Sequence, residues 1–295
     1  MNNTPIDISV IMPAYKAEAF IAQALDSVIA QQFSGTFDIW VADDISPDST
    51  GQIIDEYQKK YPQLIHAVTR TQNLGCSSNS LDLVLRSTGK YVAYCDNDDY
   101  WIDPLKLQKQ FDFLEANPEY GMTCCGAQMV DAHDRKGKLS DTPFVESFME
   151  MMQLPRDVFN SSVMLRKELY LQMVEDSKWF IDNKCFFDTV WAYWFAFHSK
   201  IHYMPEHMLA YRELAESESH SEDKERLYRM DKRYWTLKAR FLLTHDMDVE
   251  DKMTILSQEY DYLYNMAYYQ GTEHVKVSKP YQLGRMIKKL LFRKR

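Results

Sequence analysis

Four consecutive polar residues, Asp96-Asn97-Asp98-Asp99, place three carboxylates directly after an apolar stretch of the chain. Carboxylate oxygens are hard ligands, which suit Mg²⁺ or Mn²⁺ better than Zn²⁺. Such an ion uses one or two protein carboxylates and takes its other ligands from water and substrate phosphates. The pattern is therefore typical of a site for a divalent metal and a phosphorylated ligand. A solvated acidic turn or a helix N-cap is the alternative interpretation.

Two further carboxylates stand in settings that suit a specific role. Asp44 follows a second apolar stretch, and a carboxylate at a strand end can accept hydrogen bonds from a nucleobase or a ribose. Asp188 has Phe186, Phe187 and Trp191 as sequence neighbours. An apolar setting raises the pKa of a carboxyl group and makes it a better general base. Asp188 also suits an N-cap, and the two roles are compatible.

The first hundred residues contain the elements that must position these side chains. Apolar, β-branched stretches predict strands at 6–12, 37–42, 64–69 and 91–95, the first of them interrupted by Pro13. Apolar residues at helical spacing predict intervening helices around 20–29, 53–57 and 81–85. This alternation predicts a parallel sheet with right-handed crossovers, in which ligands bind beyond the carboxyl ends of the strands. Polar clusters follow each predicted strand, although loops are polar in any case.

The pattern is looser after residue 103. It predicts helices at 104–115, 167–174 and 185–198, and strands at 122–130, 163–165 and 201–204. Residues 135–155 show no clear periodicity and are expected to form a mobile loop. Residues 222–269 predict a helical hairpin, broken near 246–248.

Composition excludes several classes of protein. The chain has 295 residues, 45% of them hydrophobic, and a net charge of -9, which argues against a nucleic-acid partner. The longest apolar run, 190–197, is too short to span a bilayer, and the N-terminus does not resemble a secretory signal. Five cysteines without CxxC spacing indicate a reducing, cytoplasmic location.

The C-terminus differs from the rest of the chain in its charge. Residues 276–295 carry eight basic side chains and no acidic one. Leu283, Ile287 and Leu290 fall on one helical face, with Lys288 and Arg293 on the other. Such a helix can lie on an anionic membrane surface, which predicts peripheral attachment to the inner face of the cell membrane. The alternative is that its apolar face packs on the protein's own hairpin.

Three stretches, in this order, resemble family 2 of the inverting glycosyltransferases, which have the GT-A fold: SVIMPAYKAEAF at 9–20, VADDISPDST at 41–50 and CDNDDYW at 95–101. The resemblance implies an α/β fold with a GT-A-like, mostly parallel sheet flanked by helices, here followed by a C-terminal helical extension. It implies a nucleotide-sugar donor, usually a UDP-sugar, and Mn²⁺ or Mg²⁺ as cofactor. The acceptor would be a glycan or lipid-linked glycan in cell-surface polysaccharide synthesis.

Motif positions carry the family's roles over to this chain. Donor binding is implied for Pro13, Ala14, Tyr15, Glu18, Asp44, Asn79, Asp96 and Asn97, with Asp44 at the base and Asp96 at the ribose or sugar. The same comparison implies that Asp98 binds the metal and that Asp188 is the general base. By this reading, residues 1–103 form the nucleotide-sugar-binding half, 104–220 the acceptor-binding half, and 221–295 the helical hairpin and basic amphipathic tail.

Two residues depart from the family pattern. Phe187 stands where a Glu is common, and Leu214 stands where many relatives have a His. These departures motivate one alternative function, a catalytically inactive module that binds nucleotide-sugars. A sugar nucleotidyltransferase, which also places acidic metal ligands on an α/β sheet, is the other alternative.

Overall fold

The computed structural model describes residues 5–140, 148–153, 158–178, 181, 187–214, 237–252 and 254–256. The chain divides into two compact units, one of residues 1–148 with 156–221 and one of residues 149–155 with 222–295.

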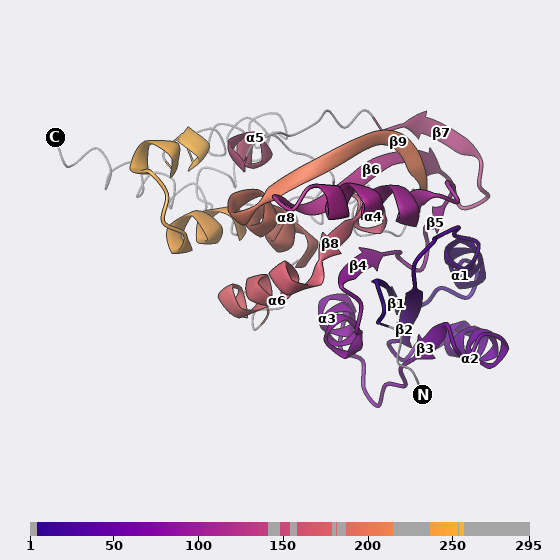
Figure 1. The fold of residues 1–295 in the computed structure, drawn as a ribbon. Helices are drawn as coiled ribbons and strands as arrows, with labels where there is room; N and C mark the ends of the chain where they lie inside the picture. The colour runs from indigo at the N-terminus through magenta and orange to yellow at the C-terminus, as the bar shows by residue number, and fades with distance from the viewer. Residues whose placement is uncertain are drawn as a thin grey trace, which may run out of the picture. The chain divides into compact units, whose positions relative to one another are not determined.

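The first unit is built on a sheet with the strand order β3-β2-β1-β4-β8-β6-β9-β5, and β7 is added to β6 (Figure 1). Its strands are β1 (Ile8–Ala14), β2 (Phe37–Asp43), β3 (Ile65–Ala67), β4 (Tyr91–Tyr94), β5 (Tyr100–Trp101), β6 (Tyr120–Val130), β7 (Lys136–Leu139), β8 (Met164–Arg166) and β9 (Lys200–Arg212). Its helices are α1 (Ile21–Ile29), α2 (Thr50–Lys60), α3 (Cys76–Arg86), α4 (Lys106–Ala116), α6 (Lys167–Asp176), α8 (Phe187–His198) and the short 3₁₀ helix η1 (Asn160–Ser162).

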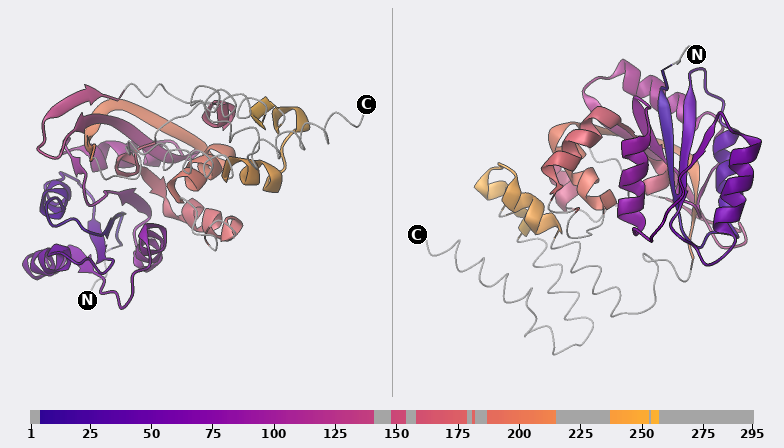
Figure 2. Two further views of the ribbon diagram at one scale, coloured as in Figure 1. Left: turned by 180° about the vertical axis from the view of Figure 1, so that it is seen from behind. Right: turned by 90° about the horizontal axis from the view of Figure 1, so that it is seen from below.

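The first half of the sheet is parallel. β1 pairs in parallel with both β2 and β4, and β2 pairs in parallel with β3. Helices α1 and α2 cover one face of these strands and α3 covers the other (Figures 1 and 2). The buried residues of α1 recur at helical spacing, because that face packs on the sheet: Ile21, Ala24, Leu25 and Val28. The predicted α/β class with alternating strands and helices is confirmed.

The expected interruption at Pro13 is wrong, because β1 continues through it to Ala14. β1 pairs with β4 only as far as Ile11. Pro13 lies beyond that point, so its missing N–H removes no hydrogen bond from the ladder to β4.

The second half of the sheet is mixed. β8 runs antiparallel to β4 and to β6, whereas β9 runs parallel to β6 and antiparallel to β5. β9 is 13 residues long, far longer than the predicted strand at 201–204. Its register against β6 shifts around Gly126, and this irregularity hides the alternation on which a sequence prediction depends.

The prediction of a mobile loop at 135–155 is wrong in part, because the structure contains a strand and a helix there. β7 pairs antiparallel with β6, and Gln128 Nε2 donates to the carbonyls of Gly137 at 3.0 Å and Lys138 at 3.2 Å. The helix is α5 (Phe148–Gln153). All four residues of β7 are exposed, so backbone pairing forms this strand and no apolar pattern indicates it.

Most of the described residues of the second unit are helical. Residues 237–244 and 249–252 are helical, and the break predicted near 246–248 is confirmed. The remainder of the predicted hairpin and the whole basic tail lie outside the described residues.

Candidate functional site

The polar loops that follow β1, β2 and β4 meet at one edge of the sheet. The backbone N–H of Lys16 donates to Ser46 Oγ at 2.8 Å, which ties the loop after β1 to the loop after β2. Asn97 Nδ2 donates to the carbonyl of Tyr15 at 3.3 Å, which ties the loop after β4 to the same place. The expected convergence of the strand ends is therefore present.

Four predicted donor ligands lie at the end of β1. Pro13 and Ala14 are buried in the strand, and Tyr15 emerges with 45% of its surface exposed. Glu18 is exposed, and its Oε2 accepts a hydrogen bond from the backbone N–H of Ser49 at 3.0 Å. The backbone thus presents the Tyr15 ring at the open edge, while Glu18 joins two of the loops around it.

Asp44 is buried and holds the loop that precedes α3. Its two carboxylate oxygens accept hydrogen bonds from the backbone N–H groups of Leu74 and Gly75, each at 2.7 Å. Asn73 Nδ2 donates to the carbonyl of Asp44 at 2.7 Å. Gly75 has φ +80°, which side chains rarely allow. Asp44 therefore shapes this loop, and its contact with a nucleobase stays a prediction.

Asn79 is buried and joins α3 to the end of β2. Its Oδ1 accepts from Arg70 Nε at 2.9 Å and Nη2 at 2.7 Å, and its Nδ2 donates to the carbonyl of Ala42 at 3.1 Å. Arg70 also forms an ion pair with Asp82. The contact of Asn79 with the nucleotide-sugar donor stays a prediction. The sequence analysis missed Arg70, although a charged residue directly after a predicted strand was a usable signal.

The acidic loop, residues 96–99, is held at both ends. Asp96 Oδ1 accepts from Asn160 Nδ2 at 2.7 Å. Asp99 is 3% exposed, and its oxygens accept from the N–H of Arg212 at 2.9 Å and from Ser161 Oγ at 2.7 Å. Burial, together with the charges of Asp98 and Asp96, raises the pKa of Asp99 well above its usual range.

Asp98 is the carboxylate that this arrangement leaves available. Among the described residues, no other side chain or backbone N–H donates a hydrogen bond to its carboxylate oxygens. Burial raises its pKa, against the opposing effects of its own backbone N–H and the positive charge of Arg212. A nearby divalent cation would favour its charged form.

The donor set fits a Mg²⁺-like ion that is shared with a phosphate ligand. The described part of the chain contains no group of three or more His, Cys, Asp or Glu side chains arranged to hold a metal alone. Mg²⁺-like ions bind through one or two carboxylates and complete their coordination with water and phosphate oxygens. Asp98 meets that requirement, so an ion here would depend on a bound diphosphate.

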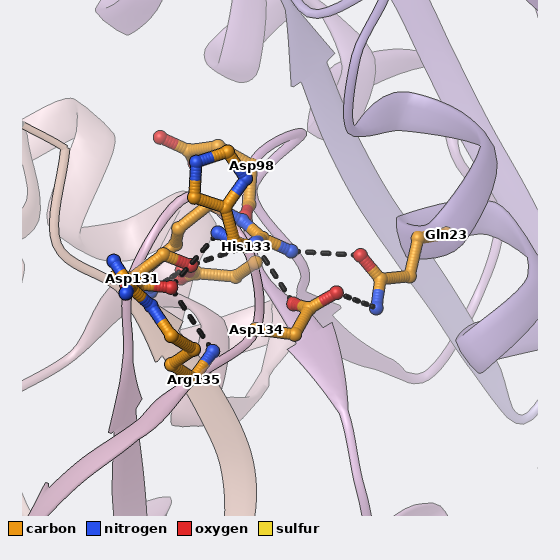
Figure 3. A network of polar contacts seen from close by, with 8 residues as sticks. Gln23, Asp98, Asp131, His133, Asp134 and Arg135 are labelled. Carbon is orange, nitrogen blue, oxygen red and sulfur yellow. Dashed lines mark hydrogen bonds and ion pairs between the residues drawn. The ribbon is translucent and has the colours of Figure 1, made fainter.

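Arg212 connects two other elements to the acidic loop. Figure 3 shows three of the residues with which it forms hydrogen bonds, Gln23, Asp98 and Asp134. Its Nε donates to the carbonyl of Asp98 at 2.8 Å, and its Nη2 donates to Gln23 Oε1 at 2.7 Å. Its Nη1 donates to the carbonyl of Asp131 at 3.1 Å and to Asp134 Oδ1 at 2.8 Å. The guanidinium group therefore links α1, the turn after β6 and the acidic loop. Arg212 was not among the site residues predicted from the sequence.

Asp188 lies at the start of α8, and its side chain lies outside the described residues. The rings of Tyr94 and Trp191 are 5.1 Å apart between centroids. Tyr94 ends β4, two residues before Asp96, and Trp191 is three residues after Asp188. The beginning of α8 is thus next to the strand that delivers the acidic loop.

Comparison with known proteins decides the family. The model of the family described as "Glycosyl transferase family 2" matches residues 9–196, which is more than half of the chain. The chain belongs to glycosyl transferase family 2.

Curated relatives in the comparison are 29% to 41% identical over 112 to 137 residues. One is the putative teichuronic acid biosynthesis glycosyltransferase TuaG of Bacillus subtilis, which is 34% identical over 114 residues, 39% of this chain and 44% of TuaG. The chain spans less than half the length of each of these curated relatives.

Solved structures share the fold. S. aureus TarS 1–349 in complex with UDP-GlcNAc is 19% identical with a TM-score of 0.61, over 95% of this chain and 78% of TarS. The mannosyltransferase PcManGT from Pyrobaculum calidifontis, in complex with GDP-Man and Mn²⁺, is 14% identical with a TM-score of 0.57, over 100% of this chain and 89% of that protein. The predicted GT-A-like fold of this family 2 member is confirmed.

Proposed function

We propose that this family 2 member is a metal-dependent inverting glycosyltransferase that moves a sugar from a nucleotide-diphosphate donor to a hydroxyl group of a glycan. The observation that carries the proposal is the acidic loop. Asp96 and Asp99 are held by neighbouring groups, while the carboxylate of Asp98 has no donor from another described residue. The carboxylate of Asp98 is therefore the one that would bind an ion.

Asp98 would hold Mn²⁺ or Mg²⁺, and the bound ion would neutralise the charge that develops on the leaving diphosphate. Asp96 follows the end of β4 by two residues, and its carboxylate would contact a ribose or sugar hydroxyl of the donor. Pro13, Ala14, Tyr15 and Asn97 surround the same edge and would line the donor pocket. The Mn²⁺ in the complex of PcManGT supports this cofactor class.

Asp188 would take the proton from the acceptor hydroxyl, which then attacks the anomeric carbon from the face opposite the diphosphate. One displacement of this kind inverts the anomeric configuration without a covalent intermediate. The contact between Tyr94 and Trp191 supports the assignment, because it brings the start of α8 near the acidic loop.

The donor and acceptor classes are supported by the relatives. The UDP-GlcNAc in the complex of TarS supports a UDP-sugar donor. The GDP-Man in the complex of PcManGT supports a GDP-sugar donor as the alternative. The name of TuaG supports a polysaccharide or lipid-linked glycan as acceptor. No helix in the described part of the chain has the length and apolar character to cross a bilayer. The basic tail at 276–295 supports attachment to an anionic membrane surface.

The test is to identify the products. We expect the purified protein with Mn²⁺ to release a nucleoside diphosphate from a matching nucleotide-sugar, found first by a thermal-shift screen of UDP- and GDP-sugars. Release of pyrophosphate would instead identify a sugar nucleotidyltransferase. Binding without any turnover, with glycan acceptors present, would identify an inactive binding module.

A further inference from the structure

The turn η1 lies beside the acidic loop because of how β8 pairs with β4. The two strands are antiparallel, with Ala93 opposite Met164, and the N–H of Tyr94 donates to the carbonyl of Val163 at 3.1 Å. Antiparallel pairing places the residues that precede β8 next to the residues that follow β4. Residues 160–162 therefore meet residues 96–99, although more than 60 residues separate them in sequence.

The hydroxyl group of Ser161 bridges the two ends of the acidic loop. Its Oγ accepts a hydrogen bond from the backbone N–H of Asp96 at 2.9 Å and donates one to Asp99 Oδ2 at 2.7 Å. The N–H of Asp96 can only donate, so the single hydroxyl proton is left for Asp99. Ser161 is fully buried, so both hydrogen bonds are shielded from solvent.

Asn160 holds the carboxylate of Asp96 from the same turn. Its Nδ2 donates to Asp96 Oδ1 at 2.7 Å. Its own Oδ1 is buried and has no hydrogen-bond partner in the part of the chain that the structure describes. Reversing the amide would place this oxygen against the Asp96 carboxylate, so the contact with Asp96 fixes its orientation. The turn tolerates an unpaired polar atom and keeps this contact.

The turn is itself fixed to α4 and β5. Trp101 Nε1 donates to the carbonyl of Ser161 at 2.9 Å, and Gln110 Nε2 donates to the carbonyl of Ser162 at 2.9 Å. Gln110 Oε1 in turn accepts from the buried Lys106 Nζ at 2.8 Å. The support for the acidic loop is therefore anchored outside the loop.

We propose that Ser161 and Asn160 are positioning residues that hold Asp96 and Asp99 so that Asp98, between them, presents its carboxylate to the metal and diphosphate. This inference rests on the proposed function, because it assumes that Asp98 binds the ion. Both residues would act through Asp96 and Asp99, the two carboxylates that they contact. Groups that orient a metal ligand commonly affect metal affinity by about 10- to 100-fold when they are removed.

The test measures Mn²⁺ affinity directly, by electron paramagnetic resonance of free Mn²⁺ during titration of the full chain with UDP or GDP present. We expect Ser161→Ala and Asn160→Ala each to weaken Mn²⁺ binding by about 10-fold or more, with little change in nucleotide affinity without metal. The matched control is Ser162→Ala. Ser162 is equally buried, but its hydroxyl donates to the carbonyl of Phe159 at 2.7 Å and touches no part of the acidic loop.

Three results would overturn the inference. Equal Mn²⁺ affinity in Ser161→Ala, Asn160→Ala and wild type would show that the turn does not position Asp98. An equal loss of Mn²⁺ affinity in all three variants, including Ser162→Ala, would show that any substitution in η1 disturbs the turn as a whole. A wild-type protein that binds no Mn²⁺ with either nucleotide would overturn the proposed function and this inference with it. If Ser161→Ala fails to fold, the half-buried Asn160 still decides the question through Asn160→Ala.

Discussion

Asp188 is the residue on which the chemical step depends in this account, since a base must take the proton of the acceptor hydroxyl. Asp188→Asn keeps the size of the side chain and removes its ability to accept the proton. We expect kcat to fall by about 10²–10⁴ with donor affinity nearly unchanged. Single-turnover kinetics together with calorimetric donor binding would measure both. A loss of donor affinity at unchanged kcat would make Asp188 a donor-binding residue and place the base elsewhere.

Arg212 joins several parts of the site through hydrogen bonds from a buried side chain. Its side chain is 1% exposed and donates to Gln23, Asp98, Asp131 and Asp134. Arg212→Met removes these hydrogen bonds from a guanidinium group that is itself buried, and we expect the free energy of unfolding to fall by about 3 kcal/mol in urea titrations.

Arg135→Ala is the matched control for Arg212→Met. Arg135 pairs with Asp131 in the same turn, but 78% of its side chain is exposed. Exposed ion pairs contribute about 0–1 kcal/mol, so we expect a small effect. Equal destabilisation by the two substitutions would contradict the role given to burial.

The loop before α3 depends on the backbone of Gly75. Gly75 has φ +80° and ψ 155°, a region that is essentially restricted to glycine, and a Cβ there would meet no atom within 4 Å. Gly75→Ala therefore strains only the backbone, and we expect it to cost about 1–3 kcal/mol of unfolding free energy. Gly137→Ala in exposed β7 is the control, because its Cβ would make ordinary contacts near 3.5 Å. Similar thermal melting of the two variants would refute this interpretation.

The parallel half of the sheet was predictable and the second half was less so, for a physical reason. β1 to β4 are short and apolar, and the helices between them carry apolar residues at regular spacing, so local sequence determines them. β7 is exposed along its whole length, and β9 changes register against β6. Those strands depend on partners distant in sequence, which a local pattern does not reveal.

The acidic side chains at the site were predictable because they follow predicted strands. Their supports were not, since Ser161 and Arg212 reach the acidic loop through the pairing of β8 with β4 and of β9 with β5, strands distant in sequence. Lys106 was also missed. It is fully buried in α4, and that burial lowers its pKa to about 8.

At the scale of the whole molecule, the basic tail at 276–295 carries a prediction about location. We expect the full-length protein to float with anionic vesicles in a density gradient and to be released at high salt. A chain that ends at Ser278 should stay in the soluble fraction, because it lacks the amphipathic helix and most of the basic side chains. Equal flotation of both proteins would contradict membrane attachment through the basic tail and would leave the proposed transfer reaction unaffected.

The central claim is that the chain releases a nucleoside diphosphate from a nucleotide-sugar with the help of an ion held by Asp98. The most direct measurement is the rate of that release with Mn²⁺, with excess chelator, and in Asp98→Ala. Asp112→Ala, which changes an exposed carboxylate on α4, is the control. We expect chelation and Asp98→Ala each to abolish release, since the diphosphate loses its countercharge, while Asp112→Ala keeps the wild-type rate. Full release in excess chelator, or by Asp98→Ala, would contradict the account.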